Sequence, residues 1–513
     1  MQQEKIIVID LGSQYTQLIA RRVRELNVFS EIRTTDITLD DVKREKPLGI
    51  ILSGGPASVY EYGSPEIDRK ILELGIPILG ICYGLQFIGR AYGGEVHPGK
   101  SAEYGKTELQ VIVPDSVLFK GLNPELICWM SHGDVLAAAP KGFRITARTY
   151  NTPVAAMENP HKKLYAVQFH PEVTHTPWGM ELLRNFIFDV CKAGGNWKVA
   201  SFIDTTVEQI RDRVKAARVL CGISGGIDSL ATAVLAEKAV GNQLHCIFVD
   251  HGLMRLKEAD QVERVFKKQF RANFQRVNSA RRFFSKLEGV TNPERKRKII
   301  GREFIRVFEE SARKLEDIKF IAQGTIYPDV IESHGVGKHA HVIKSHHNVG
   351  GLPKQMKYKL IEPLRDLFKD EVRKVALNMG VPESVVYRQP FPGPGLAIRI
   401  IGAVTPRKVR ILQHADAIIQ EELAQSEIYA NIGQAFGVLP DIKSVGVMGD
   451  RRTYGYPIIL RIVTTTDWMT ADWARIPYHV LERISNRIIN EVVEVNRVAY
   501  DISSKPPATI EWE

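Results

Sequence analysis

Short apolar runs alternate with stretches of helical periodicity through much of the chain. A first series of apolar runs comprises residues 6–9, 49–52, 76–79 and 164–169, and a second comprises 219–223, 244–250 and 320–323. Apolar runs of this length between helical stretches are typical of buried parallel strands. The pattern therefore predicts two tandem α/β domains with mainly parallel sheets.

The last part of the chain has a different pattern. The string Pro390-Phe391-Pro392-Gly393-Pro394-Gly395 cannot continue a helix or a central strand, so it predicts the entrance to a third unit. We expect that unit to be a small α+β domain, with helices at 407–423 and 478–496 and strands at 444–448, 457–463 and 498–502. Residues 192–196, Lys-Ala-Gly-Gly-Asn, suit a linker. The predicted domains are 1–195, 196–388 and 389–513.

Charge and cysteine content indicate which partners and which cellular compartment to expect. The 513 residues include 69 Lys and Arg against 59 Asp and Glu, and this excess of +10 is spread diffusely, which favours phosphorylated metabolites over nucleic acid as partners. The five cysteines form no CxxC pair, so neither disulfides nor a zinc site is expected. Because there is no signal segment and no run of about eighteen apolar residues, we expect a soluble, cytoplasmic protein without a membrane partner.

Cys82 lies in a candidate nucleophile turn. In Gly80-Ile81-Cys82-Tyr83-Gly84 a glycine stands two residues before and two residues after it, between the predicted strand and a helix that residues 85–89 can open. Such a turn exposes the side chain and directs the sulfur toward a helix N-terminus, which favours the thiolate.

A proton carrier for this thiolate is predicted after the strand at 164–169. His170 and Glu172 share a face of an extended segment, so Glu172 can orient the imidazole. Taken singly, a cysteine or histidine after an apolar run is most often a buried structural residue. The turn at Ser53-Gly54-Gly55-Pro56 can add backbone N–H groups that form an oxyanion hole with the Tyr83 amide. The combination favours a Cys-His-Glu amidase.

A second candidate site is the string Ser224-Gly225-Gly226-Ile227-Asp228-Ser229. It follows the predicted strand at 219–223 and precedes a helical stretch at 230–235, so backbone donors converge at a helix N-terminus. The string lacks the Gly-Lys-Ser/Thr of a Walker A loop, and its hydroxyls and glycine amides suit a leaving pyrophosphate. Glycine-serine strings are often only turns, but the flanking strand and helix favour a nucleotide site.

The first 190 residues resemble the class I glutamine amidotransferases. That resemblance implies that Cys82 attacks the side-chain amide of glutamine and that His170 protonates the departing ammonia. It also implies an oxyanion and glutamine pocket made by Gly54, Tyr83, Gln86, Ser131, His132 and Gly133.

The loop at 224–229 resembles that of the N-type ATP pyrophosphatases, which adenylate a carbonyl oxygen. The resemblance implies that all six loop residues bind ATP, and the next strand adds the Val249 backbone as a candidate adenine contact. Asp250 is a weaker candidate for a polar contact. Lys369 is a candidate for stabilising negative charge on a phosphate.

Nearly the whole chain resembles the glutamine-hydrolysing GMP synthases, on the domain order and on motifs at 323–329, 344–348, 388–395 and 505–513. This resemblance implies that XMP, ATP, glutamine and water give GMP, AMP, pyrophosphate and glutamate, and that Mg²⁺, with unknown ligands, accompanies ATP. It further implies a homodimer formed through the C-terminal domain. The XMP contacts that it suggests are Arg297, Lys505, Ile510 and Glu511.

Other families that share one of the two motifs fit less well. Asparagine synthetase-like chains carry a cysteine directly after the first methionine, where this chain has Gln2. Glutamine-dependent NAD synthetases carry a nitrilase-type amidase, and transfer-RNA thiolases need no glutamine site. A basic RNA-modifying enzyme on the pyrophosphatase fold stays the alternative, although the sequence has no interleaved aromatic and basic string for stacking on RNA.

Overall fold

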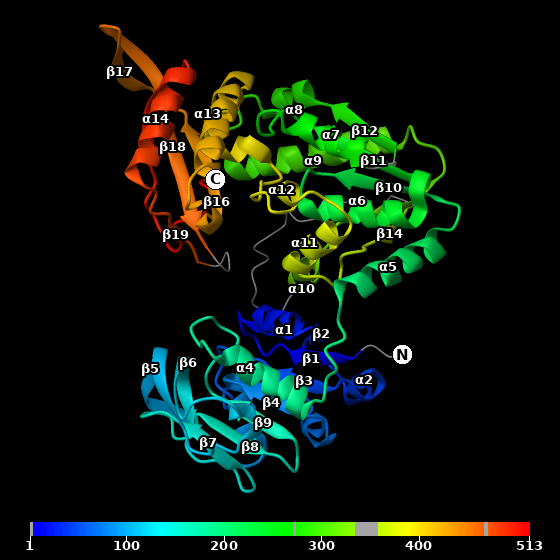
Figure 1. The fold of residues 1–513 in the computed structure, drawn as a ribbon, viewed down its shortest axis with the longest axis vertical. Coiled ribbons are helices and arrows are strands. Elements are labelled where there is room, and N and C mark those ends of the chain that lie inside the picture. Colours follow the sequence, from blue (N-terminus) through cyan, green and yellow to red (C-terminus); the bar gives the residue numbers. More distant parts are fainter. Residues whose placement is uncertain (1–3, 270–272, 334–357, 466–469) are drawn as a thin grey trace. The chain divides into compact units, whose positions relative to one another are not determined.

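The computed structural model describes residues 4–269, 273–333, 358–465 and 470–513 (Figure 1). These residues form two compact units, one built mainly from the chain up to Phe202 and the other from Ile203 onward. Among the described helices, none combines the length and the apolar character that crossing a membrane requires. The mixed α/β class predicted from the sequence is confirmed.

The first unit is built on a nine-stranded sheet in the order β2-β1-β3-β4-β9-β8-β7-β5-β6. Its parallel half comprises β1 (Lys5–Ile9), β2 (Phe29–Arg33), β3 (Gly49–Leu52), β4 (Ile78–Ile81) and β9 (Leu164–Val167). Its antiparallel half comprises β5 (Val96–Val111), β6 (Glu125–Leu136), β7 (Arg144–Arg148) and β8 (Ala156–Asn159). The helices include α1 (Thr16–Glu25), α2 (Leu39–Glu45), α3 (Tyr83–Ala91) and α4 (Gly179–Arg184). Every residue of β3, β4 and β9 is buried, which explains their continuous apolar runs.

The second unit contains a five-stranded parallel sheet in the order β12-β11-β10-β13-β14. These strands are β10 (Arg218–Ile223), β11 (Leu244–Asp250), β12 (Asn273–Asn278), β13 (Ile318–Ala322) and β14 (Lys359–Ile361). Its helices include α6 (Ile227–Val240), α7 (Glu258–Gln269), α8 (Ala280–Leu287), α9 (Pro293–Ala312), α11 (Lys369–Asn378) and α12 (Glu383–Val386). Helices α5 (Val199–Val214) and α10 (Tyr327–Ser333) have residues in both units. The strand order reverses beside β10, and open α/β sheets bind ligands at such a reversal, at the carboxyl ends of the strands.

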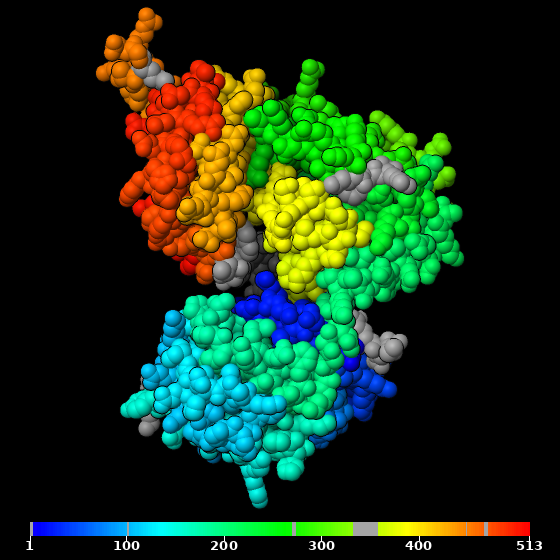
Figure 2. Space-filling model, viewed as in Figure 1, coloured from blue at the N-terminus to red at the C-terminus, as the bar shows by residue number. Residues whose placement is uncertain are grey.

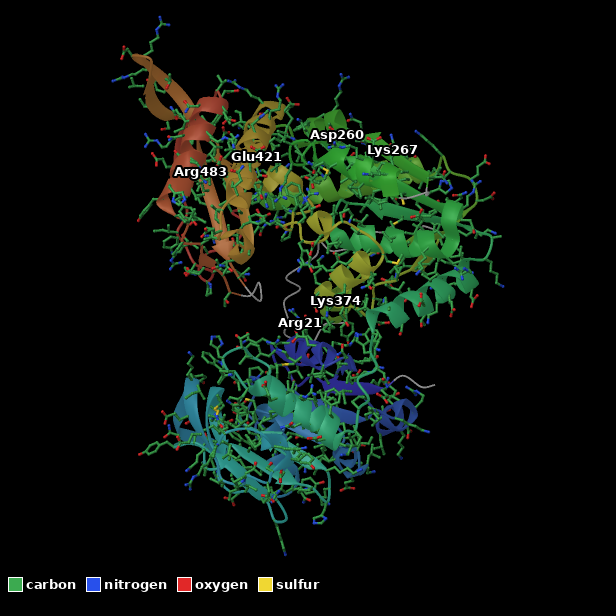
Figure 3. The ribbon with its side chains drawn as sticks, viewed as in Figure 1. Arg21, Asp260, Lys267, Lys374, Glu421 and Arg483 are labelled. Carbon is green, nitrogen blue, oxygen red and sulfur yellow. The ribbon has the colours of Figure 1, made fainter. Side chains whose placement is uncertain are left out.

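The second unit also contains a mixed sheet, centred on β18 (Arg451–Thr464). The other described strands of this sheet are β15 (Ile400–Ile401), β16 (Gln434–Pro440), β17 (Ser444–Met448), β19 (Asp472–Trp473) and β20 (Val495–Tyr500). Helices α13 (Pro406–Ala424) and α14 (Tyr478–Glu491) lie side by side (Figures 1 and 2). An ion pair joins the two helices, since Arg483 of α14 bonds Glu422 of α13 at 2.8 Å. Figure 3 labels Arg483 on α14 and Glu421, the neighbour of Glu422, on α13.

The two sheets of the second unit share one buried core. Leu220 and Ile247 of the parallel sheet belong to the same apolar cluster as Leu439 and Ile458 of the mixed sheet. The domain boundaries at 195 and 388 stay predictions. No break in the buried core marks the boundary at 388, because one apolar cluster includes residues on both sides of it.

Three predicted elements of the C-terminal part were wrong at their ends. The strand predicted at 457–463 is β18, which begins at Arg451. The helix predicted over 478–496 ends at Glu491, and the last strand is Val495–Tyr500 rather than 498–502. Val495 pairs in parallel with Tyr456 of β18, so sheet pairing takes residues that helical periodicity had assigned to the helix. The strand predicted at 76–79 likewise begins only at Ile78, since Pro77 has no N–H to donate to a neighbouring strand.

Candidate functional site

Cys82 lies in a tight turn between β4 and α3. Its backbone has φ 54° and ψ −105°, a left-handed conformation that residues other than glycine rarely adopt. The Cys82 N–H donates to the carbonyl of Val167 in β9 at 2.8 Å. A Cβ atom on Gly80 would lie 2.5 Å from the carbonyl oxygen of Gly84, and one on Gly84 would lie 2.7 Å from that of Leu52. Both glycines of the motif are therefore required by close backbone approach.

His170 and Glu172 form a buried pair beside this cysteine. Nδ1 of His170 and Oε1 of Glu172 are 2.8 Å apart. The His170 backbone is fixed as well, because its N–H donates to the carbonyl of Trp129 at 3.0 Å. Burial lowers the pKa of His170, but the charge of Glu172 and hydrogen bonds to Cys82 and Glu172 outweigh burial, so this pKa lies well above its ordinary value. The imidazole therefore holds a proton that it can deliver to a leaving group.

The turn after β3 approaches both groups. A Cβ atom on Gly54 would lie 3.1 Å from Cε1 of His170 and 3.5 Å from Cβ of Cys82. The buried hydroxyl of Ser53 accepts from the Leu11 N–H and donates to the Gly54 carbonyl, both at 2.9 Å. Tyr83 is the first residue of α3, so its N–H has no acceptor within the helix. Gly54 and Tyr83 thus both lie next to Cys82, and their role as an oxyanion hole stays a prediction.

The predicted glutamine pocket comes from β6 and α3. The carbonyl oxygen of Ser131 lies 3.8 Å from Cys82 Sγ. Gln86 and His132 are both buried, and both contact the Asp134 carbonyl at 3.0 Å, so their side chains support the pocket from behind. Gly133 is exposed.

Sequence reasoning missed Gln168 in this site. Its Nε2 lies 3.6 Å from Cys82 Sγ. The signal was available, since Gln168 stands two residues before His170 at the end of one predicted strand and therefore shares its face.

The loop at 224–229 closes around the start of α6. The hydroxyl oxygens of Ser224 and Ser229 are 3.0 Å apart, and the Ser224 N–H donates to Ser229 Oγ at 3.2 Å. Gly225 has φ +82°, which glycine adopts without strain, and Gly226 is the residue before the first turn of α6, which begins at Ile227. The two serines therefore hold the loop at a helix N-terminus, where anions bind.

Asp228 and Lys369 meet at this loop. Nζ of Lys369 bonds Oδ2 of Asp228 at 2.5 Å. Among the described residues, Oδ1 of Asp228 is buried without a hydrogen-bond partner. A Cβ atom on Gly324 would lie 3.0 Å from the Asp228 carbonyl carbon, so the segment after β13 packs directly against the loop. Lys369, a weaker candidate from the sequence, thus lies beside the pyrophosphate loop.

The adjacent strand leaves part of its backbone open. Pairing of β11 with β10 ends at Phe248, so Val249 and Asp250 extend beyond β10 on that side. The Asp250 carboxylate is already engaged, because Arg276 donates to Oδ2 at 2.7 Å and the Gly252 N–H donates to Oδ1 at 3.0 Å. Val249 therefore has no strand partner on the β10 side, and its contact with adenine stays a prediction.

Buried arginines hold the C-terminal segment. Arg461 is 0% exposed and donates to the carbonyls of Ser503, Thr509 and Ile510 at 2.6, 2.8 and 3.3 Å. Trp512 is 42% exposed, and its indole N–H donates to Asp501 at 2.9 Å. Hydrogen bonds from a buried guanidinium, not burial of the indole, keep this segment ordered.

The four candidate XMP residues lie in and beside this segment. Arg297 donates to the Glu513 carbonyl, and both carboxylate oxygens of Glu511 accept from Arg399, at 3.1 and 2.8 Å. Ile510 contributes the carbonyl that Arg461 binds. The Lys505 backbone exchanges hydrogen bonds with Ala471 at 2.7 and 3.1 Å. The structure therefore brings Arg297 to the C-terminal segment from far away in the sequence.

The four consecutive basic residues at 295–298 differ in exposure: Arg295 and Lys298 are exposed, whereas Lys296 is buried. Lys296 is 0% exposed; its Nζ donates to the Ile400 carbonyl at 2.7 Å and contacts the Glu513 carboxylate. Two further residues at this site, Arg399 and Gln434, were missed by sequence reasoning; Gln434 Nε2 donates to Glu511 at 3.1 Å. The motif at 344–348 lies outside the described residues.

Known proteins match the chain along its whole length. Three family profiles fit: glutamine amidotransferase class-I over residues 7–190, NAD synthase over 199–296, and GMP synthase C terminal domain over 421–512. A "GMP synthase [glutamine-hydrolyzing]" of Clostridium kluyveri is 56% identical over 513 residues, 100% of both chains. One of Acetivibrio thermocellus is 58% identical over 514 residues, again 100% of both. The chain belongs to the glutamine-hydrolysing GMP synthase family.

Among solved structures, a protein from Thermoplasma acidophilum described as a "putative gmp synthase subunit a protein" is 35% identical, with a TM-score of 0.34, over 37% of this chain and 96% of that one. Membership of the GMP synthase family confirms the resemblance seen in the sequence and makes the chain an amidotransferase ligase that uses ATP. The RNA-modifying alternative is not favoured by the full-length relatives.

Proposed function

We propose that the two sites divide one reaction, in which XMP, ATP, glutamine and water give GMP, AMP, pyrophosphate and glutamate. The observation that carries the assignment of the glutamine site is buried His170, which lies 2.8 Å from Glu172 and whose pKa both Glu172 and Cys82 raise. A nucleophile and a proton carrier are thereby assembled in a chain that also has a pyrophosphate-type loop.

Glutamine hydrolysis follows from this geometry. The Cys82 thiolate attacks the carboxamide carbon, and the N–H groups of Gly54 and Tyr83 stabilise the oxyanion that develops. His170 gives its proton to the departing nitrogen, so ammonia leaves and a thioester forms on Cys82. Water, deprotonated by His170, then attacks the thioester and releases glutamate and the free thiol. Glu172 keeps the imidazole in the required orientation through the 2.8 Å contact.

The loop site supports adenylation. The purine O2 of XMP attacks the α-phosphorus of ATP, and pyrophosphate leaves toward the N–H groups and hydroxyls of residues 224–229. Ammonia then attacks C2 of the adenylated purine, and AMP departs with the oxygen. Lys369, held beside Asp228, is placed to offset the charge on the leaving pyrophosphate.

Mg²⁺ fits this site through Asp228. The buried Oδ1 of Asp228 has no hydrogen-bond partner among the described residues, and carboxylate oxygen is a preferred ligand of Mg²⁺. Within the part of the chain that the structure describes, no cluster of three or more His, Cys, Asp or Glu side chains forms a metal site. A cation here would therefore be held by Asp228 together with phosphates and water, and it would neutralise charge on the leaving pyrophosphate.

The XMP site is proposed at the C-terminal segment, with Lys505 and Arg297 toward the phosphate, and Ile510 and Glu511 toward the purine. The contact between Arg297 and Glu513 supports a shared location for these residues. Glu511 is held in place by Arg399, which leaves its orientation defined before substrate binds.

Several wider features belong to the same proposal. The chain divides into a glutamine amidotransferase domain at 1–195, an ATP pyrophosphatase domain at 196–388 and a dimerisation domain at 389–513. Exposed apolar side chains on β17 and β18, among them Val445, Val447 and Tyr454, support a homodimer through the last of these. Five free, buried cysteines suit a reducing, cytoplasmic compartment. The diffuse positive charge serves phosphorylated substrates and not nucleic acid.

Product analysis tests the reaction directly. With XMP, ATP, Mg²⁺ and glutamine, we expect GMP, AMP, pyrophosphate and glutamate in equal amounts. Replacing glutamine by ammonia should remove glutamate alone from the products. Tight RNA binding without XMP turnover would contradict the proposal and favour the RNA-modifying alternative.

A further inference from the structure

A buried carboxylate faces a buried imidazole behind the glutamine pocket. Glu103 of β5 and His132 of β6 lie directly opposite each other in the antiparallel ladder, on strands that run side by side (Figure 1). Their side chains are 5% and 2% exposed, and Glu103 Oε2 lies 3.5 Å from His132 Nε2. Burying such groups is unfavourable unless their polar atoms are paired, so the arrangement calls for a physical account.

Two hydroxyl groups fix the carboxylate of Glu103. Thr149 Oγ1 donates to Oε1 at 2.9 Å, and Thr152 Oγ1 donates to Oε2 at 2.6 Å. The two threonines also bond each other. The Thr152 N–H donates to Thr149 Oγ1, and the Thr149 N–H donates to the Thr152 carbonyl, both at 3.0 Å. The position of Glu103 is therefore set by the turn after β7.

His132 connects this carboxylate to the main chain of the pocket. Its Nδ1 lies 3.0 Å from the Asp134 carbonyl, and because a carbonyl oxygen only accepts, the proton lies on Nδ1. The pKa of His132 lies below its ordinary value, because the lowering effect of burial outweighs the raising effect of the Glu103 charge. Nε2 has no hydrogen-bond partner among the described residues, and Oε2 of Glu103 is the polar atom beside it, at 3.5 Å. With Nδ1 protonated, the two side chains attract each other when a further proton lies on Nε2 or on Oε2.

The segment fixed in this way forms the wall that faces the nucleophile. Ser131 directly precedes His132, and its carbonyl oxygen lies 3.8 Å from Cys82 Sγ. At the other end, Asp134 Oδ1 accepts from the Tyr60 hydroxyl at 2.9 Å, and its carbonyl also accepts from Gln86. Displacement of His132 would therefore move the backbone that approaches Cys82.

We propose that Glu103 and His132 are positioning residues of the glutaminase: they hold the main chain of residues 131–134 at the separation from Cys82 that bound glutamine requires. The inference rests on the proposed role of Cys82 as the nucleophile. Neither side chain touches the reacting atoms, so their loss weakens glutamine binding more than it slows the chemical step.

The test compares two substitutions of Glu103. Glu103→Ala removes the acceptor of both hydroxyls and the neighbour of Nε2, so we expect the KM for glutamine to rise about tenfold or more, with kcat falling less than about threefold. Glu103→Gln keeps a carbonyl acceptor and offers an N–H to Nε2, so it should restore KM to within about threefold of the original chain. Thr152→Val, which removes one hydroxyl, should give an intermediate KM.

Two controls separate positioning from general damage. Glu108→Ala, on the same strand but exposed and opposite Ile127, should leave the KM for glutamine unchanged. GMP formation from ammonia should be normal in all four variants, because it does not use the glutamine pocket.

Different results would contradict the positioning role of Glu103 and the proposed function of the glutamine site. An unchanged KM in Glu103→Ala, a loss of kcat without a change in KM, or failure of Glu103→Gln to restore KM would each overturn the positioning role. If Cys82→Ala still hydrolysed glutamine, the proposed function of the site itself would be wrong. A protein in which Cys82→Ala is inactive and Glu103→Ala is normal would refute this inference alone.

Discussion

The protonation of His170 depends most strongly on a neighbouring carboxylate. Burial alone would lower the pKa of His170, and the charge of Glu172 is the largest of the interactions with Glu172 and Cys82 that raise it. Glu172→Gln keeps the shape and removes the charge, so the pKa of His170 should fall. The imidazolium that protonates ammonia would then be lost at lower pH, and the alkaline limb of the pH profile for glutamine kcat/KM should shift downward. An unshifted limb would show that another group titrates there.

A single sulfur should account for glutamine use. Because no other side chain can replace the thiolate, Cys82→Ala should abolish glutamine hydrolysis while GMP formation from high ammonia stays near its original rate. Cys191→Ala provides the matched control, since this cysteine is free and buried in the same unit. Equal loss of the ammonia-driven rate in Cys82→Ala would contradict the separation of the two chemistries.

At the scale of elements, GMP formation should depend on the start of α6 whether glutamine or ammonia supplies the nitrogen. Ser229→Ala removes the hydroxyl that meets Ser224 Oγ and the Ser224 N–H, so the loop loses its closing contacts. We expect glutamine- and ammonia-driven GMP formation to fall together, by roughly tenfold, the effect of about 1.5 kcal/mol. Ser285→Ala on α8, an exposed serine, is the control. Full adenylation in Ser229→Ala, measured by isotope exchange, would place the nucleotide elsewhere.

Elements were predictable where burial makes a strand apolar throughout. Residues 49–52 and 244–250 match β3 and β11 in both ends, because both strands lie inside parallel sheets. The long pair β5 and β6 was missed, since exposed and buried residues mix along β6 without a continuous apolar run.

Site residues were predictable where a motif is contiguous in the sequence. Cys82 and the loop at 224–229 each occupy one turn, and the structure keeps each together. The pairing of Glu103 with His132, and of Arg399 with Glu511, joins residues far apart in the chain. Arginine is almost never fully buried without a partner, so composition gave no reason to expect Arg399 and Arg461 in the interior.

At the scale of the whole molecule, the C-terminal segment should separate the two nucleotides. Removing residues 505–513 should abolish XMP binding while ATP still binds, because the loop at 224–229 is built without that segment. Lys505→Ala alone removes one charge-assisted contact, about 1.5–3 kcal/mol, or roughly ten- to hundredfold in XMP affinity. Calorimetric titration of XMP, with ATP as control, measures both. Unchanged XMP binding in both variants would make the segment purely structural.

Arg461 binds the C-terminal segment through backbone carbonyl oxygens, and every residue type has a backbone carbonyl. A saturation mutagenesis map of this region should therefore be asymmetric. Exposed Ser503 should accept almost any residue, whereas Arg461 should accept none, including lysine, whose single ammonium cannot reproduce a planar fork. Substitutions are therefore expected to be tolerated at Ser503, which gives Arg461 only its carbonyl, and not at Arg461 itself.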